Sequence, residues 1–81
     1  MTLWEGRHPS VRHFEPLFSY EHLPPHLAAV SRPFARLVEQ LLAMLPDDNP
    51  EVSASLRKLV EAKDCAVRAR VASLHNSIDG G

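Results

Sequence analysis

Residues 23–50 read LPPHLAAVSRPFARLVEQLLAMLPDDNP, and this stretch decides the fold. Its apolar residues recur at alternating steps of three and four positions, which is the spacing of one face of an α-helix. The members of this repeat are Leu27, Val30, Phe34, Leu37, Leu41 and Met44. Val38, Leu42 and Leu45 widen the same apolar face. The pattern therefore predicts an amphipathic helix over about 23–45.

Prolines indicate where this helix begins and where it is interrupted. Pro24 and Pro25 suit a first turn, because the N–H that proline lacks would have no helical partner there. Pro33 disfavours α geometry in the residue before it, and Ser31 could cap a restarted helix. We therefore expect a short first helix at roughly 23–31 and a longer one to about 45, broken near 32 and kinked at Pro33.

The segment 46–49, followed by Pro50, is the clearest turn signal in the chain. Asn49 is a favourable N-cap and Pro50 a favourable first helical residue, so a second helix is predicted over 50–78. Its apolar face consists of Val52, Leu56, Leu59, Val60, Val67, Val71, Leu74 and Ile78. Because a short connection makes consecutive helices antiparallel neighbours, we expect an antiparallel helical hairpin over 23–78 and a tail over 79–81.

Most of the aromatic residues lie in the first twenty-two positions. Phe14, Phe18 and Tyr20 fall on even-numbered positions, as in an extended segment whose side chains alternate between two sides. Pro9 and Pro16 also argue against a regular helix here. The sequence thus predicts an extended aromatic N-terminal arm over 1–22.

The length of the chain predicts self-association. A chain of 81 residues leaves a large part of its surface in water, and small scaffolds compensate with disulfides, metals or association. Cys65 is the one cysteine, so no internal disulfide can form. Because one partner helix cannot cover both the apolar repeat and its widened flank, we expect an all-α chain that assembles as a homo-oligomer.

Composition also bears on location and partners. The net charge is −1, with ten acidic and nine basic residues, which argues against a nucleic-acid partner. No apolar run approaches the roughly 20 residues of a membrane span. The N-terminus lacks a basic-then-apolar signal pattern, and a lone cysteine is typical of a reducing compartment. We expect no membrane partner and a cytoplasmic location.

The junction between the arm and the first helix is the most suggestive region for a ligand. Aromatic side chains stack on nucleotide bases, helix N-termini attract anions, and arginine forks bind phosphates. The candidate ligand-binding residues on these grounds are Phe18, Tyr20, His22, His26, Arg32, Arg36, Arg57 and Arg68. The alternative is that the same aromatics anchor the arm on a neighbouring subunit.

A charged stripe on the second helix has several interpretations. Arg57, Glu61, Asp64 and Arg68 share one face, at spacings that allow i,i+4 ion pairs. The stripe could be a solvated surface or an ionic network between subunits. Glu61 and Asp64 also resemble half of the Mg²⁺ site of all-α nucleotide pyrophosphohydrolases, but the first helix offers only Glu39 to complete it.

Other reactive side chains lack partners in the sequence. His22 and His26 have the spacing of two metal ligands on one helical turn, but no further ligand lies nearby. Cys65 has no recognisable histidine base, so we expect it to pack in the fold. The sequence therefore predicts no catalytic residue, no metal and no cofactor.

Three motifs carry a resemblance to a known family. HLPPHL at 22–27, VSRPF at 30–34 and LRKLVEAKD at 56–64 resemble a family of short bacteriophage and prophage proteins, over about residues 14–71. By length and plan the chain is also similar to phage helical-hairpin sponges. Those proteins bind cyclic oligonucleotide or cyclic ADP-ribose immune signals and so block the CBASS and Thoeris defences. Their oligomers hold the ligands between protomers.

The resemblance implies a non-enzymatic anti-defence protein that sequesters a cyclic nucleotide signal between subunits in the cytoplasm of an infected bacterium. The alternative is a helical oligomerisation or protein-interaction module, such as a phage regulatory protein, with no small-molecule ligand. Direct DNA binding ranks third and an enzyme last. The basic residues that DNA binding would use are Arg7, Arg12, Lys58, Lys63, Arg68 and Arg70.

Overall fold

The computed structural model describes the backbone of residues 3–47 and 49–78, and side-chain surroundings as far as residue 74. The elements are α1 (Pro9–Arg12), the 3-10 helix η1 (Glu15–Phe18), α2 (Pro25–Leu42) and α3 (Pro50–Ile78). Within these described ranges there is no strand, so the prediction of an all-α fold is confirmed. The predicted tail over 79–81 and Asp48 of the predicted turn lie outside the described residues.

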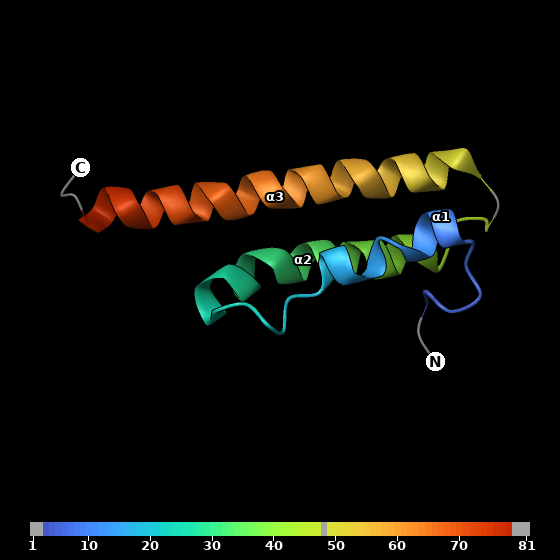
Figure 1. Cartoon of the computed structure of the whole chain (residues 1–81), viewed down its shortest axis with the longest axis horizontal. Coiled ribbons are helices and arrows are strands. Elements are labelled where there is room, and N and C mark those ends of the chain that lie inside the picture. The colour runs from blue at the N-terminus through green and yellow to red at the C-terminus, as the bar shows by residue number, and fades with distance from the viewer. Residues whose placement is uncertain (1–2, 48, 79–81) are drawn as a thin grey trace.

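Helices α2 and α3 lie side by side and run in opposite directions, in a hairpin-like arrangement (Figure 1). The N-terminal segment lies along this pair, with α1 against α3 and η1 against α2. Helix α3 has 29 residues and α2 has 18, a difference of about 16 Å at 1.5 Å per residue. The C-terminal end of α3 therefore extends beyond the start of α2 (Figure 1).

The prediction of an extended arm over 1–22 is wrong. Pro9 is the first residue of α1 and Pro16 the second of η1, positions where a helix does not need the missing N–H. The side chain of His8 caps α1, its Nδ1 accepting from the backbone N of Ser10 at 3.1 Å. The arm is thus a chain of short helical turns.

The burial of apolar side chains explains these turns. Val11, Phe14 and Phe18 are separated by steps of three and four, and all three are buried. Short helical turns direct them to one side, whereas an extended strand would have sent Val11 away from the other two. Phe18 also stacks on Trp4, with ring centroids 6.3 Å apart.

The predicted break near residue 32 is also wrong, because α2 continues through Pro33 as one helix. Pro33 lacks the N–H that would bond to the carbonyl of Ala29. The helix persists because it is packed on both sides of this defect, with Ser31 and Ala35 buried. Ser31 therefore lies inside the helix and does not cap a second one.

Helix α3 begins where a side chain caps its first turn. Asn49 Oδ1 accepts a hydrogen bond from the backbone N of Glu51 at 2.9 Å, and Pro50 occupies the first helical position. Toward the other end, Val71 is exposed and Leu74 half-buried. The apolar face of α3 is therefore covered near the turn and less covered toward its C-terminus.

The core joins the arm to both long helices. Its buried apolar residues among those described are Trp4, Val11, Phe14, Phe18, Ala35, Val38, Leu42, Val52 and Leu56. Val38 of α2 and Leu56 of α3 have no exposed surface. Four of these nine residues come from the arm, so the arm is an integral part of the core.

A tight turn before α1 positions two buried side chains. The backbone N of Arg7 donates to the carbonyl of Trp4 at 3.2 Å, and Gly6 between them has φ of +81°. That left-handed conformation favours glycine, since a side chain would be strained there even though the space around Gly6 is open. Trp4 and Arg7, on either side, are both buried.

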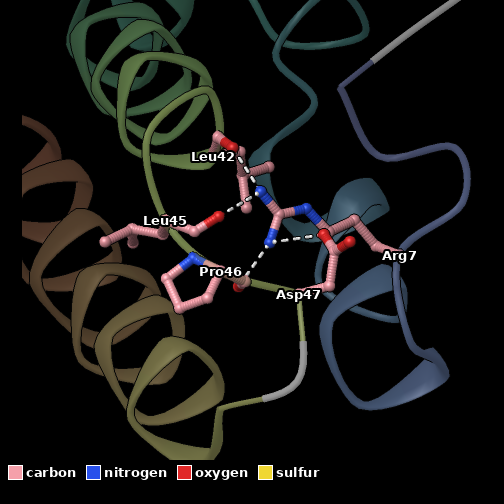
Figure 2. A network of polar contacts seen from close by, with 5 residues as sticks. All are labelled: Arg7, Leu42, Leu45, Pro46 and Asp47. Carbon is pink, nitrogen blue, oxygen red and sulfur yellow. Dashed lines mark hydrogen bonds and ion pairs between the residues drawn. The ribbon is translucent and has the colours of Figure 1, made fainter.

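Arg7 binds the carbonyl groups at the end of α2, as Figure 2 shows. Its guanidinium donates to the carbonyls of Leu42, Leu45 and Pro46, the last two at 3.1 and 2.8 Å. Nη1 also lies 3.4 Å from Oδ1 of Asp47. The last carbonyls of a helix have no helical partner and carry partial negative charge, so the guanidinium caps α2 at Leu42, its last residue. Its bonds to Leu45 and Pro46 hold the connection that follows α2.

We predict that Arg7→Gln lowers the free energy of unfolding by about 3 kcal/mol, because it leaves buried carbonyls without donors. Urea unfolding followed by circular dichroism measures this loss. Arg12→Gln is the control, because Arg12 is exposed, and it should change stability by no more than about 0.5 kcal/mol. Equal effects of the two substitutions would contradict a capping role for Arg7.

Candidate functional site

The candidate ligand-binding residues do not form one cluster. Phe18 and Tyr20 line a cavity on the arm side of α2, whereas Arg68 lines a separate cavity between α2 and α3. The remaining five, His22, His26, Arg32, Arg36 and Arg57, are exposed. Each cavity therefore has to be assessed by itself.

The arm-side cavity is apolar at its base and acidic around it. It measures about 180 Å³ and is lined by Trp4, Glu15, Phe18, Ser19, Tyr20, Glu21, Ala35 and Glu39. Phe18 is only 4% exposed and stacks on Trp4, so its ring is part of the core and is not open to a base. Three carboxyl groups around one small cavity disfavour a phosphate.

One of these carboxyl groups is held in its charged form. The pKa of Glu21 is lowered from its ordinary value by hydrogen bonds, first from its own backbone N–H and then from the hydroxyl of Ser19. Ser19 Oγ donates to Glu21 Oε2 at 3.1 Å. Since a hydrogen bond to the carboxylate favours that form, Glu21 keeps its negative charge beside the cavity at neutral pH.

Arg32 and Tyr20 interact directly across the junction of arm and helix. The guanidinium carbon of Arg32 lies 5.6 Å from the centroid of the Tyr20 ring, a cation–π contact. Arg32 is exposed and Tyr20 half-buried. A base could stack on this ring only if the guanidinium moved aside.

The second cavity, which we call the interhelical notch, lies between α2 and α3. It measures about 260 Å³, and its lining residues are Leu23, Ser31, Lys63, Asp64, Val67 and Arg68. Lys63 donates to the carbonyl of Leu17 and lies 3.4 Å from Asp64 Oδ1. The arm thereby holds Lys63 from the side opposite its acidic neighbour.

Arg68 contributes the second positive charge of the notch. Its Nη2 lies 3.3 Å from Sγ of Cys65, which is a weak acceptor. Asp64 pairs with Lys63 and not with Arg68, although the i,i+4 spacing suggested the latter pair. The guanidinium of Arg68 is exposed and has most of its donors available for a ligand.

Ser31 places an unpartnered hydroxyl on the wall of the notch. The residue is 1% exposed, and its Oγ has no hydrogen-bond partner. A buried hydroxyl without a partner costs free energy, so such groups are rare and call for an explanation.

The histidines whose side chains the structure describes do not form a metal site, with or without the cysteine. Because α2 begins at Pro25, His22 lies outside the helix and does not share a helical turn with His26. Nowhere in the described part of the chain do three or more His, Cys, Asp or Glu side chains gather in a way that could hold a metal ion. The prediction that Cys65 packs in the fold is wrong, since its side chain is exposed.

A third hollow, of about 330 Å³, lies where α1 meets the start of α3. Its polar groups hydrogen-bond to one another: His8 Nδ1 lies 3.0 Å from Ser10 Oγ, and Ser53 Oγ donates to the carbonyl of Ser10 at 3.3 Å. Because these polar groups already hydrogen-bond to one another, the hollow serves to hold α1 against the start of α3.

Comparisons with known proteins add no relative. No protein-family model, curated protein or solved structure matches the chain. None of the described helices has the length and apolar character needed to span a membrane.

Sequence reasoning missed the roles of Ser31 and Lys63. Each is a polar interruption in an otherwise apolar helix face, and the two lie at nearly equal distances along the chain from the turn at 46–49. In an antiparallel pair of helices such positions come together. Two polar residues at nearly equal distances from the turn, one on each helix, were the signal that could have located the notch.

We predict that Ser31→Ala leaves the stability of the ligand-free protein unchanged or raises it by about 1 kcal/mol, because it removes a buried hydroxyl that has no partner. Urea unfolding measures the change. Ser73→Ala, which removes an exposed hydroxyl from α3, controls for the higher helix propensity of alanine. A loss of more than about 1 kcal/mol in Ser31→Ala alone would show that the hydroxyl is already partnered.

Proposed function

We propose that this chain is a non-enzymatic protein that sequesters a phosphate-bearing nucleotide, of the cyclic kind, within a homo-oligomer. The observation that carries the proposal is the interhelical notch, which is lined by Ser31, Lys63 and Arg68 and where the buried hydroxyl of Ser31 has no hydrogen-bond partner. A guanidinium and an ammonium beside a free hydroxyl suit a phosphate group.

The other walls of the notch suit the rest of a nucleotide. Leu23 and Val67 provide apolar surface for a base or sugar, and Asp64 provides an acceptor for a hydroxyl or amino group. At about 260 Å³, the notch is slightly smaller than the ~300–1,000 Å³ typical of small-molecule sites. A cyclic oligonucleotide would therefore extend beyond one notch, which favours a site shared between copies.

Tyr20 and Arg32 lie next to the notch along the chain. Arg32 follows Ser31, and the carbonyl of Tyr20 accepts a hydrogen bond from the backbone N of Leu23 at 3.0 Å. In this proposal Arg32 leaves the ring of Tyr20 for a phosphate, and the exposed ring then stacks on a base. Arg36, Arg57, His22 and His26 have no assigned contact with the notch.

The class of nucleotide comes from the resemblance to phage helical-hairpin sponges. On that basis the ligand is a cyclic oligonucleotide or a cyclic ADP-ribose type signal, and the protein acts in the bacterial cytoplasm against CBASS or Thoeris immunity. The analogy is one of plan and not of shared site residues. The ligand class is therefore the first thing to test.

The second candidate is an oligomerisation or protein-interaction module without a small-molecule ligand. It is favoured by the large apolar side chains that the chain exposes. These are Leu3, Leu17, Leu37, Met44 and Val71. Exposed apolar side chains of this size are available to pack against another protein.

We predict that a cyclic di- or trinucleotide, or an ADP-ribose isomer, raises the melting temperature by about 10 °C at roughly a hundred times its Kd, because it binds only the folded state. A thermal-shift panel of these compounds measures the rise. Arg68→Ala should abolish it, because Arg68 supplies the free guanidinium of the notch.

Arg70→Ala is the matched control. Arg70 is an exposed arginine two positions after Arg68, and it does not line the notch. It should keep the full rise in melting temperature. If no compound in the panel moves the melting temperature, sequestration is wrong and the interaction module stands in its place.

A further inference from the structure

The apolar repeat that defines α2 is not the face that α2 buries. We call Leu27, Val30, Phe34, Leu37, Leu41 and Met44 the α2 stripe. None of the six is fully buried. Leu27, Val30, Phe34 and Leu41 are half-buried, and Phe34 packs against the core. Leu37 is 40% exposed, and Met44, which lies just beyond the end of α2, is 72% exposed. The residues that α2 does bury are Ser31, Ala35, Val38 and Leu42.

The two faces point in different directions. At 100° per residue, the centre of the α2 stripe lies roughly 95° around the helix from the centre of the buried residues. The opposite flank of α2 lies against the arm, since Arg32 contacts Tyr20 and Glu39 lines the arm-side cavity. The α2 stripe is thus the apolar flank that neither α3 nor the arm fully covers.

We propose that a second copy of this chain covers the α2 stripe by packing a helix against it. The inference rests on the self-association contained in the proposed function, and it assigns the face that forms the contact. It does not depend on the identity of the ligand.

The period of the stripe indicates a helical partner. Its steps of three and four average 3.5 residues, the repeat with which α-helices pack knobs into holes over several turns. A helix buried in the core of its own chain does not need so strict a repeat, and the face that α2 does bury includes a serine.

The charges on α2 favour a second copy over a lipid or nucleic-acid surface. The charged residues of α2 are Arg32, Glu39 and Arg36, and the first two are on the arm side. Arg36 alone remains for the open flanks. Two such faces repel each other little, whereas a membrane or nucleic-acid surface would require several flanking cations.

The available area suits a weak dimer. A stripe about 26 Å long and 10 Å wide covers roughly 260 Å² on each copy and about 520 Å² when two copies meet, which is below the ~1,200 Å² of a stable specific interface. The C-terminal end of α3 extends beyond the start of α2 (Figure 1), and Val71 of α3 is also exposed. We therefore expect weak association that increases with chain concentration.

Sedimentation velocity over a range of chain concentrations tests the assignment. The wild-type chain should sediment as a dimer or larger species, and Leu37→Glu should weaken association at least tenfold. Leu17→Glu is the matched control, because Leu17 is 45% exposed, close to the 40% of Leu37, but lies on the arm. It should associate like the wild type.

Circular dichroism verifies that each variant is folded. If Leu37→Glu does not fold, Met44→Glu repeats the test at the most exposed position of the stripe. A wild-type chain that stays monomeric overturns the self-association of the proposed function together with this inference. A wild-type oligomer that Leu37→Glu and Met44→Glu leave intact overturns the assignment of the face alone. Loss of association in Leu17→Glu to the same extent also overturns it.

Discussion

The guanidinium of Arg7 at the end of α2 is the interaction on which the rest of the structure depends. No glycine follows α2 to close it in the usual left-handed cap, so its last carbonyls need donors from elsewhere. Arg7 provides them from the far side of the turn and is itself only 8% exposed. Gly6 sets the direction of approach, and Trp4 enters the core through the same turn.

Fixing the arm in this way determines how the faces of α2 are used. The arm covers one flank and α3 covers the buried residues, so the α2 stripe is left only partly covered. The polar notch arises from the same packing, because Lys63 is held by the arm carbonyl of Leu17 on one side and faces the cavity with Ser31 on the other. One capping contact thus links the core, the notch and the open stripe.

The sequence predicted the secondary-structure elements well, but it said much less about which faces of those elements pack together. Periodicity and capping residues predict both long helices, because those signals are local. The same periodicity placed Leu37 and Met44 on the apolar repeat and Val38 and Leu42 on its flank. The flank residues are the buried ones, because spacing cannot say which partner a face meets. The prediction of an extended arm was wrong because its prolines suit the first turn of a helix as well as an extended chain. The role of Arg7 could not be predicted because it depends on a contact between residues far apart in the sequence.

The central claim is that this chain is a subunit whose apolar surface is completed by a second copy. The most direct test is the dependence of urea unfolding on chain concentration, since a dimer is stabilised by mass action and a monomer is not. Over a hundredfold range of concentration above the dissociation constant, we expect the free energy of unfolding per chain to rise by about 1.4 kcal/mol, because free monomer rises only tenfold. An unfolding midpoint that stays constant over that range would contradict the account.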